Sequence, residues 1–390
     1  MRLIEVNDKN TVREFLEINA KINSINKAYI RPIDNEVNEV FDPEKNKLFK
    51  SGEAKRWILQ NDQSETIGRI AAFISSKYIN KGTDFSTGGF GFFDCINDQE
   101  AANTLFNQAK EWLLSKGAEA MDGPINFGDR DKWWGLLVEG FDNEPMYGMS
   151  FNPSYYESLF NNYGFKNYYN QYYYFMNVDD TFSEKILERH ARIKAKTDYS
   201  ARHAKINQLE KYAGDFTKVY NAAWAQHGEA KEITEENAIK LFKKMKPILD
   251  ERTIWFAYYK EEPIAMFINI PDLNQYFKHF NGKFGWKEKL QLLWMKWKGT
   301  NKQLTGLAFG VVPKYQALGI DSYIIQECGS FAQGKGWYTR YEMGWAGDWN
   351  PRMLNIYKSL GGYQSRRMIT FRYLFDQNRP FERHPDMIYK

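Results

Sequence analysis

Cysteine is scarce in this 390-residue chain, which contains Cys95 and Cys328 and no others. Two cysteines so far apart suggest neither a disulfide framework nor a cysteine metal site. The five histidines lack a paired spacing such as His-x-x-x-His, which would place two zinc ligands on one face of a helix. The sequence therefore predicts no metal. The histidines are His190, His203, His227, His279 and His384.

Long apolar runs and an excess of charge of one sign are also missing. No stretch approaches membrane-spanning length, and the N-terminus has no basic-then-apolar signal pattern. The 53 basic and 49 acidic side chains give a net charge of +4, which argues against nucleic acid as the main partner. The sequence also lacks the Gly-x-Ser-x-Gly elbow, the motif that carries the nucleophilic serine of α/β-hydrolases. We expect a cytoplasmic protein without an integral membrane segment and without a nucleic-acid partner.

Apolar and aromatic residues, by contrast, are abundant, at 43% and 17% of the chain. Together with a length above that of one ordinary domain, this composition is ample for two hydrophobic cores. We expect an α/β (α+β) protein with domains at residues 1–180 and 199–377. Residues 181–198 are predicted to form a solvated connecting helix, and residues 378–390 a tail.

The most informative stretch begins with an apolar, β-rich run from Leu304 to Val312, which ends at Pro313, where ladder pairing has to stop. The next segment, Ile320 to Gln333, has helical spacing and closes on glycines. Gly319 at the junction lets the backbone turn its amides outward. The first amides of a helix lack internal partners and carry partial positive charge. The pattern predicts an anion cradle, with ordinary turn chemistry as the alternative.

A later helix supplies a second motif, with Asn350 as N-cap, Pro351 at the first helical position and a glycine stop. Together the two motifs resemble the GNAT superfamily of acyl-CoA-dependent acyltransferases. In that family a valine-ended strand runs into Gln/Arg-x-x-Gly-x-Gly/Ala, and a later helix reads Asn-(six residues)-Tyr-(three residues)-Gly-Phe. The residues in register with these patterns are Gln316, Gly319, Asn350, Tyr357 and Gly361.

Two residues depart from the family pattern. Asp321 stands where the family usually has glycine or alanine, and a carboxylate beside a pyrophosphate is repulsive unless it points away. Gly362 replaces the usual phenylalanine, a change that we expect to affect packing.

The resemblance implies acetyl-CoA or another acyl-CoA as co-substrate and no metal. It places the pyrophosphate on the amides of the turn and the thioester beside the preceding strand. The cofactor-binding residues that it implies are Val311, Val312, Gln316, Ala317, Leu318, Gly319, Ile320, Asp321 and Asn350.

Acyl transfer to an amine needs a polarised carbonyl, a neutral amine and a proton for the leaving thiolate. Tyr357 matches the family's helix tyrosine that supplies this proton, and a phenol pKa of about 10 suits a donor. A buried core aromatic is the alternative. For the base, Glu342 on the next strand is the first candidate and Asp348 on the following loop the second. A salt bridge with Arg340 or Arg352 is the alternative for either acid.

The first half of the chain repeats the element order of the second. Asn152 to Phe165 shares the Asn-Pro start and glycine stop of Asn350 to Tyr363, which indicates a diverged internal duplication. Nothing near Phe93 to Gln99 reproduces Gln-x-x-Gly, so we expect the first copy to lack a CoA site. The predicted fold is two tandem GNAT-like domains, each a mixed twisted sheet flanked by helices.

Two stretches leave alternatives open. The aromatic loop from Pro124 to Phe151 either packs over its own domain or lines a cleft shared with the second. A helix that begins at Trp286 is interpreted as a cover packed on its own domain; resting on an anionic membrane surface or binding an acyl chain is the alternative. Its apolar face, flanked by lysines, consists of Trp286, Leu290, Leu293, Trp294 and Trp297.

The leading hypothesis for function is a CoA-dependent N-acyltransferase that transfers an acetyl or longer acyl group to a small-molecule or peptide amine. The alternative is a non-catalytic, GNAT-derived protein that binds a small molecule, an acyl group or a peptide. A third hypothesis, an aminoacyl-tRNA-dependent transferase, would need a stronger basic groove than a net charge of +4 suggests.

Overall fold

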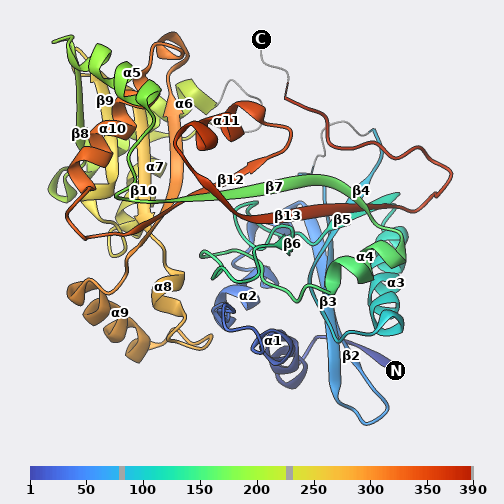
Figure 1. Ribbon diagram of the computed structural model, residues 1–390. Helices are drawn as coiled ribbons and strands as arrows, with labels where there is room; N and C mark the ends of the chain where they lie inside the picture. The colour runs from blue at the N-terminus through green and yellow to red at the C-terminus, as the bar shows by residue number, and fades with distance from the viewer. Residues whose placement is uncertain (79–83, 225–231, 388–390) are drawn as a thin grey trace.

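The computed structural model describes residues 1–78, 84–224 and 232–387. It is a mixed α/β structure in which thirteen strands form one sheet with helices packed against it (Figure 1). No helix among these residues is long and apolar enough to cross a membrane.

In the first half, the helix at residues 9–23 covers one face of the sheet and the helix at residues 99–115 covers the other. The elements of this half, in order, are β1 (Arg2–Glu5), α1 (Lys9–Asn23), α2 (Asp34–Val40), β2 (Gly52–Gln60), β3 (Thr66–Ser75), β4 (Thr87–Cys95), α3 (Gln99–Ser115), β5 (Ala120–Gly123), β6 (Leu136–Glu139), α4 (Tyr156–Tyr163) and β7 (Lys166–Asn177).

The second half repeats this plan, with an added helical arm, α8 and α9, between two strands. Its elements are α5 (Glu184–Lys194), β8 (Tyr199–His203), α6 (Leu209–Trp224), α7 (Glu235–Met245), β9 (Ile254–Tyr259), β10 (Glu262–Pro271), α8 (Asn274–Phe277), α9 (Trp286–Lys298), β11 (Gln303–Val311), α10 (Ile320–Ala332), β12 (Arg340–Gly347), α11 (Pro351–Ser359) and β13 (Tyr363–Leu374).

The two halves exchange their last strands. The sheet order is β1-β2-β3-β4-β5-β13-β7-β12-β11-β10-β9-β8, so β7, from the end of the first half, pairs with β12 of the second. β13, from the C-terminal end of the chain, pairs with β5 of the first half, with Phe371 opposite Gly123. The sequence predicted a separate sheet for each domain and did not predict this exchange. The division at residues 180 and 199 stays a prediction, because the sheet runs across it without a break.

Strand periodicity divides the core of the second half into two layers. On β9, Trp255 and Ala257 face the side covered by α5 and α10, whereas Phe256 and Tyr258 face α6 and α7. Successive side chains of a strand point to opposite faces, so a strand covered on both sides is apolar throughout. This is why the sequence shows a continuous apolar run here.

The C-terminal segment lies along the junction of the two halves. Arg383 forms an ion pair with Asp348 at 2.6 Å, and the amide of Met387 donates to the carbonyl of Trp349. Arg379 pairs with Glu119 in the first half. Up to residue 387, the segment predicted as a tail is therefore held by specific contacts; residues 388–390 lie outside the described residues.

Candidate functional site

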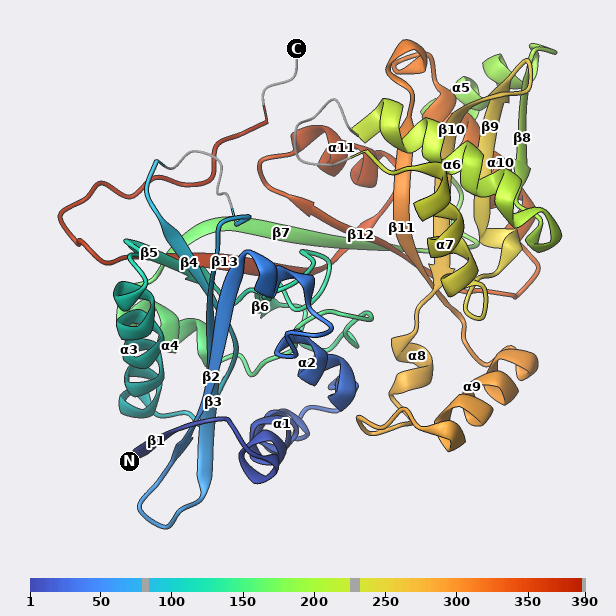
Figure 2. The same cartoon turned by 180° about the vertical axis from the view of Figure 1, so that it is seen from behind.

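The parallel strands β11 and β12 pair for three residues and then separate. The pairs are Gln303–Arg340, Leu304–Tyr341 and Thr305–Glu342. Beyond them, β11 continues along β10, and β12 continues along β7 after a bulge between Glu342 and Trp345 (Figure 2). We call the place where the strands separate the fork.

Glycines on both strands allow the fork to form. A Cβ on Gly306 would lie 2.8 Å from the hydroxyl of Tyr341 and 3.2 Å from the carbonyl oxygen of Met343. Opposite it, Gly344 has a φ of +80°, a left-handed conformation that side chains other than glycine rarely adopt. A larger residue at either position would alter the fork.

The backbone groups of β11 are divided between its two sides. The amide of Val312 donates to Ile264 on β10, and its carbonyl accepts from the amide of Tyr315, so both of its groups are taken. Because these groups alternate in direction along a strand, those of Phe309 and Val311 point toward the fork. The carbonyl of Val311 accepts from the Gln316 side chain at 3.0 Å. The backbone amide of Val311 faces the side of β11 from which β12 has separated.

The turn after β11 matches the predicted anion cradle in its backbone geometry. Ala317 and Gly319 have φ values of +60° and +95°, and α10 begins directly after them. The amide of Tyr323, which donates to the carbonyl of Gly319 at 3.0 Å, makes the first hydrogen bond of the helix. The three amides before it, from Ile320 to Ser322, therefore have no acceptor within the helix. Such a helix start suits a phosphate group.

Two arginines from α5 lie against this turn. Arg192 donates to the carbonyl of Leu318 at 3.1 Å, and a Cβ on Gly319 would lie 3.2 Å from its Nη2 and 3.3 Å from Cβ of Arg189. Sequence reasoning missed both, because it interpreted α5 as a solvated connector. No sequence signal marks them, since only the packing of α5 on α10 brings them to the turn.

Asp321 lies in the first turn of α10 and is half-buried. Among the described residues it makes no hydrogen bond or ion pair. An acidic side chain is favourable at a helix N-terminus, because it offsets the positive end of the helix dipole. The same charge opposes a phosphate that would occupy this helix end.

Two tyrosines meet at the fork. The buried Tyr357 of α11 donates a hydrogen bond to the carbonyl of Met343 at 2.9 Å, and burial raises its pKa. The hydroxyl of Tyr341 lies beside Gly306 on the other strand, and burial, followed by the nearby Tyr357, raises its pKa far above the usual range. Both phenols therefore stay protonated near neutral pH. Tyr341 was not predicted, although its register with Leu304 places it one residue before the strands separate.

Glu342 is completely buried between two arginines. One carboxylate oxygen accepts from Arg340 at 2.8 Å and the other from Arg366 at 3.1 Å. The alternative that Glu342 forms a salt bridge with Arg340 is thus confirmed. Asp348, the second candidate base, pairs with Arg383. In this structure both acids hold chain segments together.

A loop of the first half reaches the same cluster. The guanidinium of Arg366 donates to the carbonyl of Glu144, and the amide of Tyr147 donates to Asp272 at 3.0 Å. Asp272 is fully buried and also accepts from Gln303 at 2.9 Å. Burial, followed in size by the opposing hydrogen bonds from the amides of Tyr147 and Asn274, leaves the pKa of Asp272 raised to about 6. The aromatic loop therefore contacts the second half as well as its own.

Asn350 caps α11, and its side chain accepts from the amide of Met353 at 3.1 Å. The predicted N-cap is confirmed. Its contribution to cofactor binding stays a prediction, as do the roles of the turn residues Gln316 to Asp321.

The equivalent position in the first half is closed by the chain itself. The amide of Ile125 donates to the carbonyl of Phe90 at 2.7 Å, beside the parallel pair of β4 and β5. At the start of α3, the carboxylate of Asp98 accepts from the amide of Ala101, where a phosphate would otherwise bind. Both observations support the expectation that the first copy has no CoA site.

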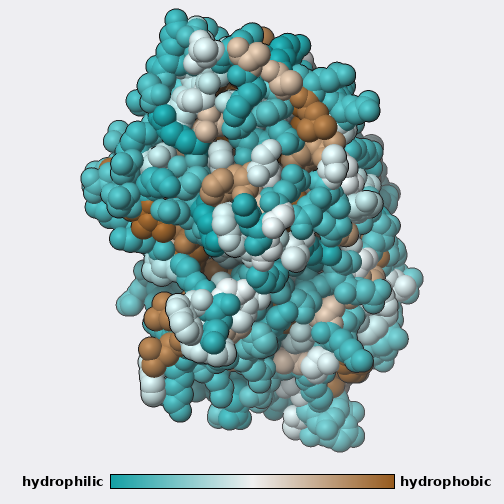
Figure 3. Space-filling view, turned by 60° about the vertical axis from the view of Figure 1, so that its left-hand side comes forward, coloured by the Kyte–Doolittle hydropathy of each residue, from teal (hydrophilic) through white to brown (hydrophobic). Residues whose placement is uncertain are grey.

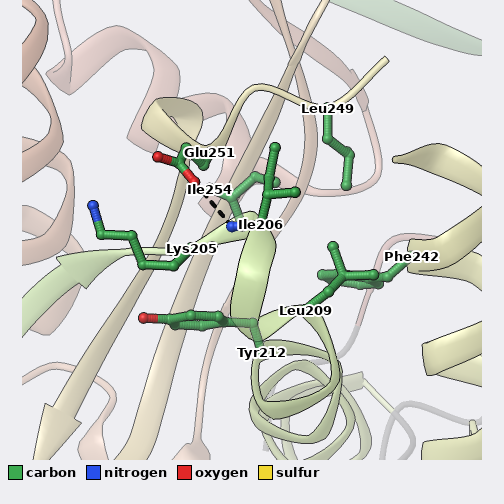
Figure 4. Close-up of a pocket in the computed structure, with 9 residues that line it drawn as sticks. Lys205, Ile206, Leu209, Tyr212, Phe242, Leu249, Glu251 and Ile254 are labelled. Carbon is green, nitrogen blue, oxygen red and sulfur yellow. Dashed lines mark hydrogen bonds between the residues drawn. The ribbon is translucent and has the colours of Figure 1, made fainter. Parts of the chain in front are cut away.

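The apolar hollow in Figure 4 is separate from the fork. It lies between β8, α6 and α7, and the amide of Ile206 donates to Glu251 at its edge. Its cavity volume of about 10 Å³ has room for a single water molecule. It cannot hold a cofactor.

No family model matches the chain. The bacterial ceramide synthase of Caulobacter vibrioides is 25% identical over 371 residues, which cover 93% of this chain and 94% of that protein. Protein YghO of Escherichia coli is 26% identical over 325 residues, which cover 80% of each chain.

Solved structures show the fold. A tandem GNAT protein from the clavulanic acid biosynthesis pathway superposes with a TM-score of 0.53 at 9% identity, over 98% of this chain and 99% of that one. A GCN5-related glucosamine N-acetyltransferase region of a fungal β-N-acetylglucosaminidase superposes with a TM-score of 0.55 at 12% identity. The match covers 95% of this chain and 38% of that multi-domain protein. The chain has the tandem GNAT fold, as the sequence predicted.

Proposed function

We propose that the protein is an N-acyltransferase that transfers an acyl group from acyl-CoA to a primary amine. The observation that carries this proposal is the fork, where β11, no longer paired with β12, leads to a helix start whose first three amides have no acceptor within the helix and beside which two arginines lie. Acyl-CoA offers the matching groups, because amides of its pantetheine arm can pair with the edge of β11 and its pyrophosphate suits the helix start.

In the proposed reaction the neutral amine attacks the thioester carbonyl, the C–N bond forms and the C–S bond breaks. The amide of Phe309 or Val311 donates to the carbonyl oxygen as negative charge develops on it. Tyr357 supplies a proton to the departing thiolate, and its raised pKa keeps that proton in place until the bond breaks. Glu342 stays our candidate for the base only if Arg340 releases it; otherwise the amine's proton passes to water.

The acceptor that we propose is a long-chain amine. A ceramide is the amide of a fatty acid and a long-chain amino alcohol, so the reaction named for the Caulobacter vibrioides relative joins an acyl group to an amine. The alignment spans nearly the full length of both chains. A fatty acyl-CoA and an amino alcohol are therefore our first choice of substrates, with the cytoplasm as the place where acyl-CoA is supplied.

A non-catalytic binding protein is the second candidate. The observation that favours it is the double ion pair of Glu342, which leaves the fork without a free carboxylate from β12. Such a protein would bind acyl-CoA or an acyl group and release no CoA when amines are added.

Calorimetric titration with CoA, acetyl-CoA and palmitoyl-CoA tests the binding step. We expect micromolar binding that is lost in Gly319→Trp, because the indole would fill the space beside Arg189 and Arg192. Gly336→Trp is the matched control, since Gly336 also has a positive φ near the opposite end of α10 but open space around it. No binding at millimolar concentrations of all three ligands would contradict the proposal.

Release of free CoA thiol tests the transfer step. Each acyl-CoA that binds is incubated with a long-chain amino alcohol, with ethanolamine as the short amine control, or with no amine. Release that depends on the long-chain amine supports the acyltransferase. Binding without release in any mixture would favour the non-catalytic alternative.

A further inference from the structure

The helix α9 belongs to an arm that extends from the sheet between β10 and β11 (Figures 1 and 2). Both ends of the helix are well formed. Glu288 accepts from the amide of Gly285 at 2.7 Å at the start, and Gly299 ends the helix in a left-handed conformation. The arm is held by the amide of Asp34, which donates to the carbonyl of Gly282, and by Lys296, which donates to the carbonyl of Pro247. The helix is thus a fixed part of the fold.

One face of α9 is apolar and exposed to solvent. Of the thirteen large apolar side chains that are exposed among the described residues, five lie on this helix. They are between 54% and 77% exposed, and three are tryptophans. At 3.6 residues per turn they fall within an arc of about 100°. The five are Trp286, Leu290, Leu293, Trp294 and Trp297.

The opposite face of α9 already has its partners. Leu292 and Met295 are buried against α8, in a cluster with Tyr276 and Phe277. The prediction of a covering helix therefore holds for this face only. The exposed face lies on the outside of the arm, and the space-filling view shows a hydrophobic patch at the edge of the molecule at the height of α9 (Figure 3).

Lysines border the apolar face on both sides. By helical position Lys287 and Lys298 lie on one side of it, and Lys289 and Lys296 on the other. Residues 274–302 contain seven lysines and one acidic residue, Glu288, a net charge of +6 compared with +4 for the whole chain. The ammonium groups of Lys287 and Lys298 lie 5.7 and 5.0 Å from tryptophan rings of the apolar face.

We propose that α9 binds the surface of a lipid bilayer that contains anionic lipids, with its axis parallel to the surface. Tryptophan and leucine would enter the boundary between headgroups and acyl chains, and the exposed Lys287, Lys289 and Lys298 would contact anionic headgroups. At 13 residues the helix is about 20 Å long, too short to span a bilayer.

A bilayer fits these observations better than a folded protein partner. The exposed side chains stand on a convex helix with charges on both flanks, which matches a flat anionic surface. This inference does not depend on the proposed acyl transfer. Binding through α9 would bring the fork to a membrane in which long-chain amines and fatty acyl chains reside.

Vesicle co-sedimentation tests the proposal with the full-length protein. We expect it to bind vesicles of phosphatidylcholine with 30 mol% phosphatidylglycerol at least tenfold more tightly than vesicles of phosphatidylcholine alone, and less tightly as salt is raised. A triple variant, Trp286→Ser, Trp294→Ser and Trp297→Ser, is expected to lose at least tenfold in binding. The variant Lys287→Glu combined with Lys298→Glu, which keeps the tryptophans, is also expected to lose at least tenfold in binding.

The matched control is Leu114→Ser combined with Leu241→Ser, which removes exposed apolar side chains from α3 and α7. We expect this variant to bind as the unaltered protein does. All the substituted side chains are exposed, and thermal unfolding confirms that each variant is folded. Equal binding of the tryptophan variant and the unaltered protein would overturn the proposal. So would absence of vesicle binding, or a dimer in solution that the tryptophan variant dissociates.

Discussion

The hydroxyl of Tyr357 donates a hydrogen bond to the carbonyl of Met343, 2.9 Å away, where β12 leaves β11. This bond joins α11 to the bulge of the fork. It holds the phenol proton beside the place where the strands separate, and burial, which raises the pKa of the phenol, keeps that proton bound near neutral pH. A thiolate that forms in the fork would have this proton as a neighbour.

Replacing Tyr357 with phenylalanine removes that proton and keeps the ring. We expect acyl transfer to fall by about 100-fold, in the usual range for loss of a general acid, with CoA affinity nearly unchanged. The free energy of unfolding is expected to fall by about 1 kcal/mol through loss of the hydrogen bond. Initial rates and calorimetry check both. Tyr174→Phe is the control, since its ring packs 5.5 Å from that of Tyr357. Equal rates for Tyr357→Phe and the control would show that the phenol has no chemical role.

The arginines beside the turn are expected to bind the pyrophosphate. Arg192→Gln should weaken CoA binding by about tenfold, as expected for loss of one charge-assisted hydrogen bond. The comparison is with Lys194→Gln, which removes the same charge from the same helix but from a side chain paired with Glu327 at 2.8 Å. Equal losses of affinity in the two variants, measured by calorimetry, would mean that only the general positive charge of α5 matters.

Substitution of Asp321 provides a test in which CoA affinity is expected to rise. If its carboxylate faces the bound pyrophosphate, Asp321→Gly removes a repulsion and CoA affinity rises, most strongly at low salt. Asp321→Asn keeps the size of the side chain and is the better control for effects on the helix. Titrations at two salt concentrations measure the change. An affinity that does not change in either variant would show that the carboxylate points to solvent.

The substitution Glu342→Gln separates a catalytic from a structural role. Loss of the charge leaves Arg366 buried without an ionic partner, which is expected to cost about 3 to 5 kcal/mol of unfolding free energy. Urea unfolding measures this loss, and thiol release measures the rate in the fraction that remains folded. A stable variant that has lost only its activity would instead identify Glu342 as the base.

Asp272 is expected to make stability depend on pH. Burial raises its pKa to about 6 from 3.8, so between these values the folded protein binds more protons than the unfolded chain. Stability therefore falls as pH rises through this range, by about 3 kcal/mol in total. In Asp272→Asn this fall between pH 5 and pH 7.5 is expected to disappear from urea unfolding curves.

The control for that experiment is Asp250→Asn. Burial raises the pKa of Asp250, but its hydrogen bonds with Arg252 and Tyr338 lower the pKa by more. A lowered pKa contributes stability above the pKa of the unfolded chain, so the contribution is complete at pH 5 and at pH 7.5. The loss of stability in Asp250→Asn should therefore be the same at pH 5 and at pH 7.5. A fall in Asp272→Asn as steep as in the unaltered protein would assign the pH dependence to other groups.

The sequence by itself determined the elements of the second half and the position of the turn. The apolar run from Leu304 to Val312 predicted β11, and Gly319 predicted the start of α10, because these signals are local. The N-cap at Asn350 was predicted for the same reason, since a cap is decided by residues within one turn.

Local sequence signals could not predict which strands pair across long distances in the chain. Nothing within β13 records that it pairs with β5, about 250 residues earlier, because both faces of an apolar strand can be buried in any sheet. The ion pair of Glu342 with Arg366 depends on that exchange, and the approach of Arg192 to the turn depends on the packing of α5 against α10. The sequence thus determined which residues can form the turn and the apolar face of α9. Only the tertiary structure decided which charges surround the turn and which face of α9 is left exposed.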